Sequence, residues 1–268
     1  MHPSVSRLLP AHPRRRLLLS LGLAAALPRW GRAAPPVTVA AAADLKFALE
    51  ELARLFEQHT GQAVRLVFGS SGQFYAQILQ GAPFHLFLSA DEAFVLQLAE
   101  AGKTQDRGRL YAYGRIGLFV PKGSPLKADS ELKDLAAALQ DGRVRKFAIA
   151  NPQHAPYGQR AREALQHAGL WAAIEPRLVY GENVAQAAQF AISGAAEGGI
   201  IALSLAKAPQ VAGQGDFALI PADWHRPLAQ RMVLLKGAPE AAQRFYGFLG
   251  AAQAQAVLAR YGFALPRT

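Results

Sequence analysis

The chain has 268 residues, of which 51% are apolar and 18% are charged. This length suits one large domain or two modest ones, and the high apolar share excludes a disordered chain, which could not bury enough surface to fold. The sequence contains no cysteine. Disulfides, thiol catalysis, cysteine–zinc sites and cysteine-ligated iron–sulfur clusters are therefore excluded.

The N-terminal 34 residues have the organisation of an export signal. They hold six arginines and no acidic residue, and Arg14, Arg15 and Arg16 lead directly into an apolar run at 17–27. That run is too short to span a bilayer but suits the core of a signal peptide, and small residues at 31–34 offer a cleavage site. We predict that residues 1–34 are a signal peptide, twin-arginine-like or Sec, and that the protein is periplasmic. The alternative is a disordered basic arm.

The net charge of +10 raises the question of a nucleic-acid partner. Six of these positive charges belong to the predicted signal peptide. The rest of the chain has no cluster of Lys and Arg interleaved with aromatic residues, which binding to a phosphate backbone requires. We therefore expect no nucleic-acid partner. No stretch after residue 34 reaches the 18 apolar residues expected of a membrane span.

From residue 37 onward, strand-like and helix-like segments alternate. Strands are predicted at 37–42, 64–68, 84–88, 111–120, 146–150, 177–180, 198–202, 217–220 and 231–235. A long helix is predicted after Asp44 and is closed by Gly61, and a short helix through 74–79 follows a turn at 69–72. Further helices are predicted at 89–101, 130–139, 157–169 and 184–192, with two closing helices from 239 and 251. This alternation is typical of α/β proteins whose mainly parallel sheets are covered by helices on both faces.

Two such series in succession favour two lobes over one continuous sheet. We predict that residues 35–117 and 229–268 form lobe I and that residues 118–228 form lobe II. We therefore expect the two closing helices to pack against the first lobe.

Four junctions between a strand and a helix could bind an anion, at 42–44, 69–72, 155–158 and 182–184. Ligands of open α/β sheets lie at the carboxyl ends of the strands, where helix N-termini present unpaired amides and partial positive charge. The strongest junction is Gly69-Ser70-Ser71-Gly72, because its glycines allow close backbone approach and its hydroxyls add neutral donors. The alternative there is an ordinary turn with a serine N-cap.

Motifs of catalysis are weak in this sequence. The segment 69–72 lacks the G-x-S-x-G spacing of a nucleophile elbow, and there is no H-E-x-x-H motif and no glycine-rich nucleotide-binding loop. We expect no enzymatic activity and no cofactor. The enzyme alternative is a secreted serine hydrolase that uses Ser71 with His154 or His85.

Four segments, at 37–45, 81–91, 151–158 and 260–263, resemble the periplasmic molybdate-binding proteins of ABC importers. The resemblance covers essentially the whole chain beyond the signal peptide, in matching order. It implies a two-lobed, type II periplasmic-binding fold with its ligand in the cleft between the lobes. It further implies a molybdate or tungstate ligand held by hydroxyls and amides without direct coordination of the metal, an ABC permease of the inner membrane as partner, and a monomeric protein.

The resemblance also implies a set of ligand-binding residues. In the first lobe these are Ser71 with Ser70 beside it, and the junction Ala43-Asp44. In the second lobe Tyr157 and Val184 would offer helix-start amides, and the Tyr157 phenol could add a donor.

Three positions differ from the family pattern. Asp44 stands where many members have a serine, and we expect it to offer its amide to the anion while its side chain caps the following helix. Ala202 stands where some members have a tyrosine, for which Tyr157 could compensate. His85 replaces an acidic residue. Asp44 keeps open the alternative that the ligand is another oxyanion or a small organic acid.

The role of Ser71 can be tested by the substitution Ser71→Ala. We expect the variant to bind its oxyanion about 1–3 kcal/mol more weakly, because a buried hydrogen-bond partner is lost. Calorimetric titration measures this difference, and an unchanged affinity would place Ser71 outside the binding site.

Overall fold

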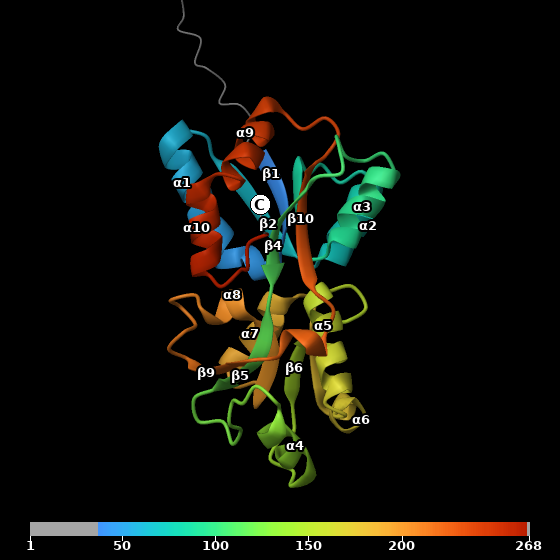
Figure 1. The fold of residues 1–268 in the computed structure, drawn as a ribbon, viewed down its shortest axis with the longest axis vertical. Helices are drawn as coiled ribbons and strands as arrows, with labels where there is room; N and C mark the ends of the chain where they lie inside the picture. The colour runs from blue at the N-terminus through green and yellow to red at the C-terminus, as the bar shows by residue number, and fades with distance from the viewer. Residues whose placement is uncertain (1–36, 267–268) are drawn as a thin grey trace, which may run out of the picture. The chain divides into compact units, whose positions relative to one another are not determined.

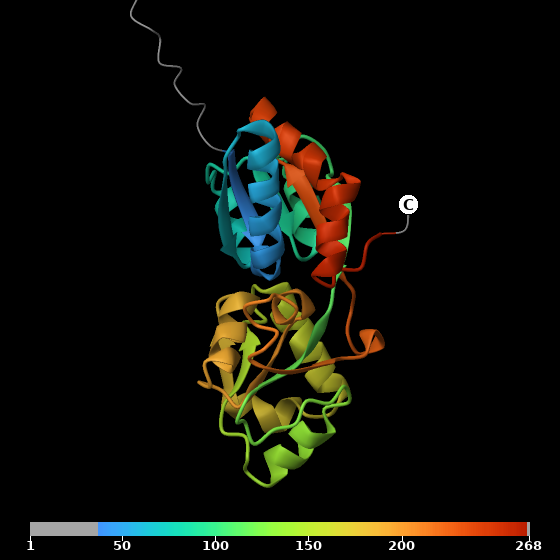
Figure 2. The ribbon, with the colours of Figure 1, turned by 90° about the vertical axis from the view of Figure 1, so that its left-hand side faces the viewer.

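The computed structural model describes residues 37–266, and the predicted signal peptide lies outside them. The described chain forms two five-stranded sheets, each with its own helices (Figures 1 and 2). None of the helices in this part of the chain combines the length and apolar character needed to cross a membrane.

The first sheet has the strand order β2-β1-β3-β10-β4. Its strands are β1 (Val37–Ala42), β2 (Val64–Gly69), β3 (Leu86–Ser89), β4 (Arg109–Gly114) and β10 (Leu228–Leu234). Its helices are η1 (Ala43–Leu45), α1 (Lys46–Thr60), α2 (Ser71–Leu79), α3 (Glu92–Glu100), α9 (Glu240–Leu249) and α10 (Ala252–Arg260). In Figure 1, α1, α9 and α10 lie on one side of this sheet and α2 and α3 on the other.

The second sheet has the strand order β7-β6-β8-β5-β9. Its strands are β5 (Ile116–Pro121), β6 (Phe147–Ala150), β7 (Leu178–Gly181), β8 (Gly198–Ala202) and β9 (Gly215–Leu219). The helices around it are α4 (Lys133–Gln140), α5 (Pro156–His167), α6 (Trp171–Ile174), η2 (Glu175–Arg177), α7 (Val184–Ile192), α8 (Leu203–Ala206) and η3 (Ala222–Trp224).

Both sheets are mixed. In the first, β1 is parallel to β2 and β3, whereas β10 is antiparallel to β3 and β4. In the second, β6 is parallel to β7 and β8, whereas β5 is antiparallel to β8 and β9. The antiparallel pairs involve the strands at which the chain passes from one sheet to the other, β4 to β5 and β9 to β10 (Figure 2).

The prediction of one strand over 111–120 is wrong, because the chain changes sheets within it. β4 ends at Gly114 and β5 begins at Ile116, in the other sheet. A Cβ atom at position 114 would collide with the Tyr157 hydroxyl and approach the Gln230 amide. A glycine is therefore required where these two side chains pass the strand.

We call each sheet with its helices one half of the molecule, and the first half is the one built on the first sheet. Its core forms around β1, which is buried along its length except at Thr38. Such a central parallel strand is covered on both faces, which explains its apolar sequence. The amphipathic helix α1 buries Leu49, Leu52 and Phe56 against it and ends at Gly61, whose φ of 68° suits a glycine. The Phe56 and Phe245 rings lie 5.0 Å apart, so α9 from the end of the chain packs beside α1.

Candidate functional site

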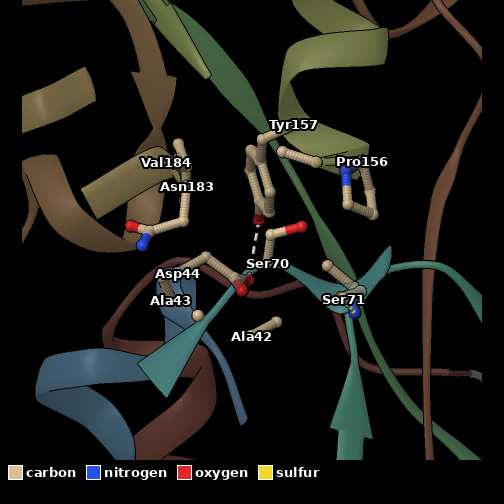
Figure 3. Close-up of a pocket in the computed structure, with 12 residues that line it drawn as sticks. Ala42, Ala43, Asp44, Ser70, Ser71, Pro156, Tyr157, Asn183 and Val184 are labelled. Atoms are coloured by element: carbon tan, nitrogen blue, oxygen red, sulfur yellow. Dashed lines mark hydrogen bonds between the residues drawn. The ribbon is translucent and has the colours of Figure 1, made fainter. Parts of the chain in front are cut away.

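A small cavity lies where the carboxyl ends of β1 and β2 face the N-termini of α5 and α7 (Figure 3). The structure brings all six predicted site residues to its lining: Ala43, Asp44, Ser70, Ser71, Tyr157 and Val184. Of the described residues that line it, none is a lysine, arginine or histidine. The cavity is therefore small and free of cationic side chains.

The first sheet contributes two serines at the start of α2. Ser71 is fully buried, and its Oγ accepts a hydrogen bond from the Ala90 amide at 2.9 Å. Its own proton is not used in that bond and can be donated to a guest. Ser70 uses its hydroxyl differently, because its Oγ donates to the backbone carbonyl of His154 at 2.6 Å.

The second half contributes the first turns of two helices. α5 begins with Pro156, whose ring suits the first helical position, and Tyr157 follows it. α7 begins with Val184, and the Asn183 side chain that caps it accepts from the amides of Ala185 and Gln186. This cap leaves the Val184 amide unused. The two helix starts thus offer amides and the positive ends of two helix dipoles to the cavity.

The prediction that the Asp44 side chain caps the following helix is wrong. Asp44 lies inside the short helix η1, and α1 begins at Lys46 with Leu45 at its N-cap and no side-chain cap. The carboxylate is only 1% exposed and turns toward the second half instead. Its Oδ2 accepts from the Tyr157 hydroxyl at 2.9 Å and from Gln230 Nε2 at 2.6 Å. The Tyr157 phenol therefore donates to Asp44 (Figure 3).

Burial dominates the electrostatics of this cluster. It raises the pKa of Asp44 to about 6, although the hydrogen bonds from Gln230 and Tyr157 oppose the shift. Burial, with the nearby Asp44 charge, also raises the pKa of Tyr157 and of Tyr111 well above the ordinary value. Both phenols therefore remain protonated donors at neutral pH. Tyr111 donates to Gln230 Oε1 at 2.6 Å.

Several contacts join the two halves around the cavity. The His154 carbonyl accepts from the Gly72 amide at 3.0 Å in addition to the Ser70 hydroxyl. Beside them, Arg160 of α5, which is 2% exposed, pairs with Asp91 at the start of α3 at 3.2 Å. These contacts hold the halves closed over the cavity.

The serine hydrolase alternative required Ser71 to pair with His154 or with His85, and the structure shows neither pair. His85 Nδ1 accepts from the Thr38 amide at 3.0 Å, away from the cavity. His154 Nδ1 contacts Ser70 and not Ser71, at 2.9 Å from Ser70 Oγ. The Ser70 hydroxyl already donates its proton to a carbonyl, so this imidazole nitrogen can only donate to it. The contact does not activate a nucleophile.

The sequence reasoning missed Gln230, which is fully buried in β10 and holds both Asp44 and Tyr157. The only signal was a glutamine in a strand that is otherwise buried on that face. Ala202, at the end of β8, is buried and does not line the cavity. In residues 37–266 no group of three His, Cys, Asp or Glu side chains is placed to hold a metal ion.

A two-lobed α/β fold with a small anion-suited cavity between its lobes defines a solute-binding protein. Residues 37–264 match the family model described as bacterial extracellular solute-binding protein. Curated relatives include the molybdate-binding protein ModA of Rhodobacter capsulatus, 38% identical over 91% of this chain and 93% of the relative. ModA of Azotobacter vinelandii is 36% identical over 93% of this chain and 97% of the relative.

The solved structure of the Azotobacter vinelandii periplasmic molybdate-binding protein matches with a TM-score of 0.79 and 33% identity, covering 86% of this chain and all of that one. The predicted fold class, a two-lobed type II periplasmic-binding fold, is thereby confirmed. The chain belongs to the bacterial extracellular solute-binding family, as a homologue of the ModA proteins.

Gly72 allows a test of closure. A Cβ atom at this position would lie 2.6 Å from the His154 carbonyl oxygen of the opposite half. We expect Gly72→Ala to weaken oxyanion binding about tenfold or more, since the halves cannot close fully, without lowering the unfolding midpoint of the unliganded protein. Calorimetry with molybdate and thermal unfolding measure the two quantities. Gly247→Ala is the matched control, because nothing lies within 4 Å of a Cβ there. Equal affinities of the two variants would contradict this role.

Proposed function

We propose that the protein captures molybdate in the periplasm with high affinity and delivers it to an ABC permease by closure of its two lobes. Tungstate fits the same proposal. The observation that carries it is the cavity itself, where the Ser71 hydroxyl and the starts of α5 and α7 converge from opposite halves. Homology to ModA proteins along almost the whole chain supports the choice of anion.

The chemistry of the cavity suits a small tetrahedral dianion. Hydroxyls, amides and helix ends disperse its charge, and no cation has to be desolvated in order to bind it. Selection among tetrahedral dianions then depends on the size of the closed cavity. We propose that Ser70, Ser71, Ala43, Asp44, Tyr157 and Val184 form this site.

Closure is a shift of population toward the closed lobes, which the anion stabilises by touching both. The permease would then recognise the closed form. We propose that the chain divides into two lobes close to the predicted bounds, with residues 35–115 and 228–268 in lobe I and 116–227 in lobe II, because β5 begins at Ile116 and β10 at Leu228. We also propose that the protein acts as a monomer without catalysis. Export by residues 1–34, along the twin-arginine or the Sec route, belongs to the same proposal.

A second candidate is another small anion on the same fold. The observation that favours it is the buried carboxylate of Asp44 in the cavity lining, because a negative group there opposes a dianion.

A panel of anions separates the two candidates. We expect molybdate and tungstate to raise the unfolding temperature in proportion to RT ln(1 + [L]/Kd), and sulfate and phosphate to have much smaller effects at equal concentration. Thermal-shift series followed by calorimetry provide the measurement. A response to sulfate, phosphate or an organic acid alone would favour the second candidate and contradict the first.

A further inference from the structure

Asp44, whose side chain is buried, lines the cavity that is proposed to hold a dianion. Among residues 37–266 none of the ion pairs involves this side chain. An ionised Asp44 beside a doubly negative guest would be repelled strongly, because burial weakens the screening of both charges. The negative charge of Asp44 must therefore be neutralised when the dianion is bound.

The hydrogen bonds of the carboxylate are distributed unequally between its two oxygens. Oδ2 accepts from the Tyr157 hydroxyl and from Gln230 Nε2, at 2.9 and 2.6 Å. Oδ1 is buried and has no hydrogen-bond partner in the described structure. This is the pattern of a carboxylic acid, in which one oxygen accepts and the other carries a proton to donate.

The neighbours of Asp44 fix that assignment. Gln230 turns its Nε2 toward Asp44, and its Oε1 accepts from the Tyr111 hydroxyl. Its Nε2 reaches the Tyr157 oxygen at 3.2 Å as well as Asp44 Oδ2. The side-chain donors therefore converge on Oδ2. The backbone amides of Asp44 and Leu45 also approach the carboxyl group, but Oδ1 forms no hydrogen bond and is the oxygen that can take a proton.

The groups that face Asp44 include no positively charged side chain that could neutralise its carboxylate. Two titratable side chains approach it, Tyr157 from α5 and Tyr111 from β4 through Gln230, and both are held as protonated phenols. α7 and α8, which pack against η1, have no ionisable side chain. The neighbouring Lys46 is exposed and lies over the Phe47 ring. β2 has Arg65, which is exposed.

We propose that the site binds its oxyanion together with one proton, which resides on Asp44 Oδ1 and is donated to the anion as a hydrogen bond. This inference rests on the proposed function. When the ligand is a fully ionised oxyanion such as molybdate, the Asp44 carboxylate takes its proton from solution, so one proton is bound and none is released. The raised pKa of Asp44, about 6, makes this uptake accessible near neutral pH. Asp44 thereby becomes a hydrogen-bond donor whose donation depends on pH.

The sign of the pH dependence follows from linkage. Below about pH 6 the unliganded protein already carries the proton, so affinity is nearly independent of pH. Above it, binding requires proton uptake, and affinity for molybdate falls about tenfold per pH unit. Asp44→Asn removes this dependence, because an amide matches the shape, accepts at one end and donates at the other without titrating.

The test is calorimetry of the purified protein with sodium molybdate at pH 7.5, in two buffers of different ionisation enthalpy, and a series of affinities from pH 5.5 to 8.5. We expect about one proton taken up per molybdate by the wild type and by the control Asp216→Asn, whose carboxylate is exposed on β9. For Asp44→Asn we expect no uptake, an affinity that changes less than about twofold across the series, and tighter binding than the wild type at pH 8.5.

The outcomes separate the two proposals. If wild-type protein binds molybdate without proton uptake, or if Asp44→Asn keeps the wild-type pH slope, the proton inference is overturned and the proposed function stands. If neither protein binds molybdate at any pH of the series, the proposed function is overturned. Binding by Asp44→Asn alone would show that Asp44 stays charged and excludes the dianion, which contradicts both. The wild-type proton count does not depend on the folding of any variant.

Discussion

Unpaired amides at helix N-termini are the feature on which the rest of this structure depends. A helix start cannot satisfy its own first amides, and α5 and α7 bring two such starts to one cavity opposite the Ser71 hydroxyl. The mixed sheets serve this arrangement, since the parallel pairs β1–β2 and β6–β7 place the carboxyl ends of their strands at the cavity. The donors are uncharged and come from both halves. An anion that meets them can therefore hold the halves together without a buried cation.

Asp44 adds a second constraint to this neutral site. Burial of a carboxylate in the lining is costly unless its charge is cancelled. The side chains that contact it are Tyr157 and Gln230, and neither is a cation. Closure brings Tyr157 of one half to Asp44 of the other, so the same hydrogen bond links the position of the halves to the state of the carboxylate. Capture of the anion and protonation would then be parts of one event.

The sequence predicted the parts of the site that depend on local chemistry. A Gly-Ser-Ser-Gly turn between a strand and a helix, and a proline at a helix start, are signals that a single segment carries, and Ser71 and Tyr157 do line the cavity. The sequence could not predict the direction of the Asp44 side chain, because its partners Tyr157 and Gln230 lie 113 and 186 residues away. The sequence could not predict the change of sheet after Gly114 for the same reason, because the side chains that require the glycine come from distant segments.

The measurement that tests the central claim most directly is a crystal structure of the protein grown with molybdate, with anomalous diffraction to locate the metal. The account predicts one strong peak in the cavity, with oxyanion oxygens within hydrogen-bonding distance of Ser71 Oγ and of the Tyr157 and Val184 amides. A peak outside the cavity, or an anion held mainly by arginine and lysine side chains, would contradict it.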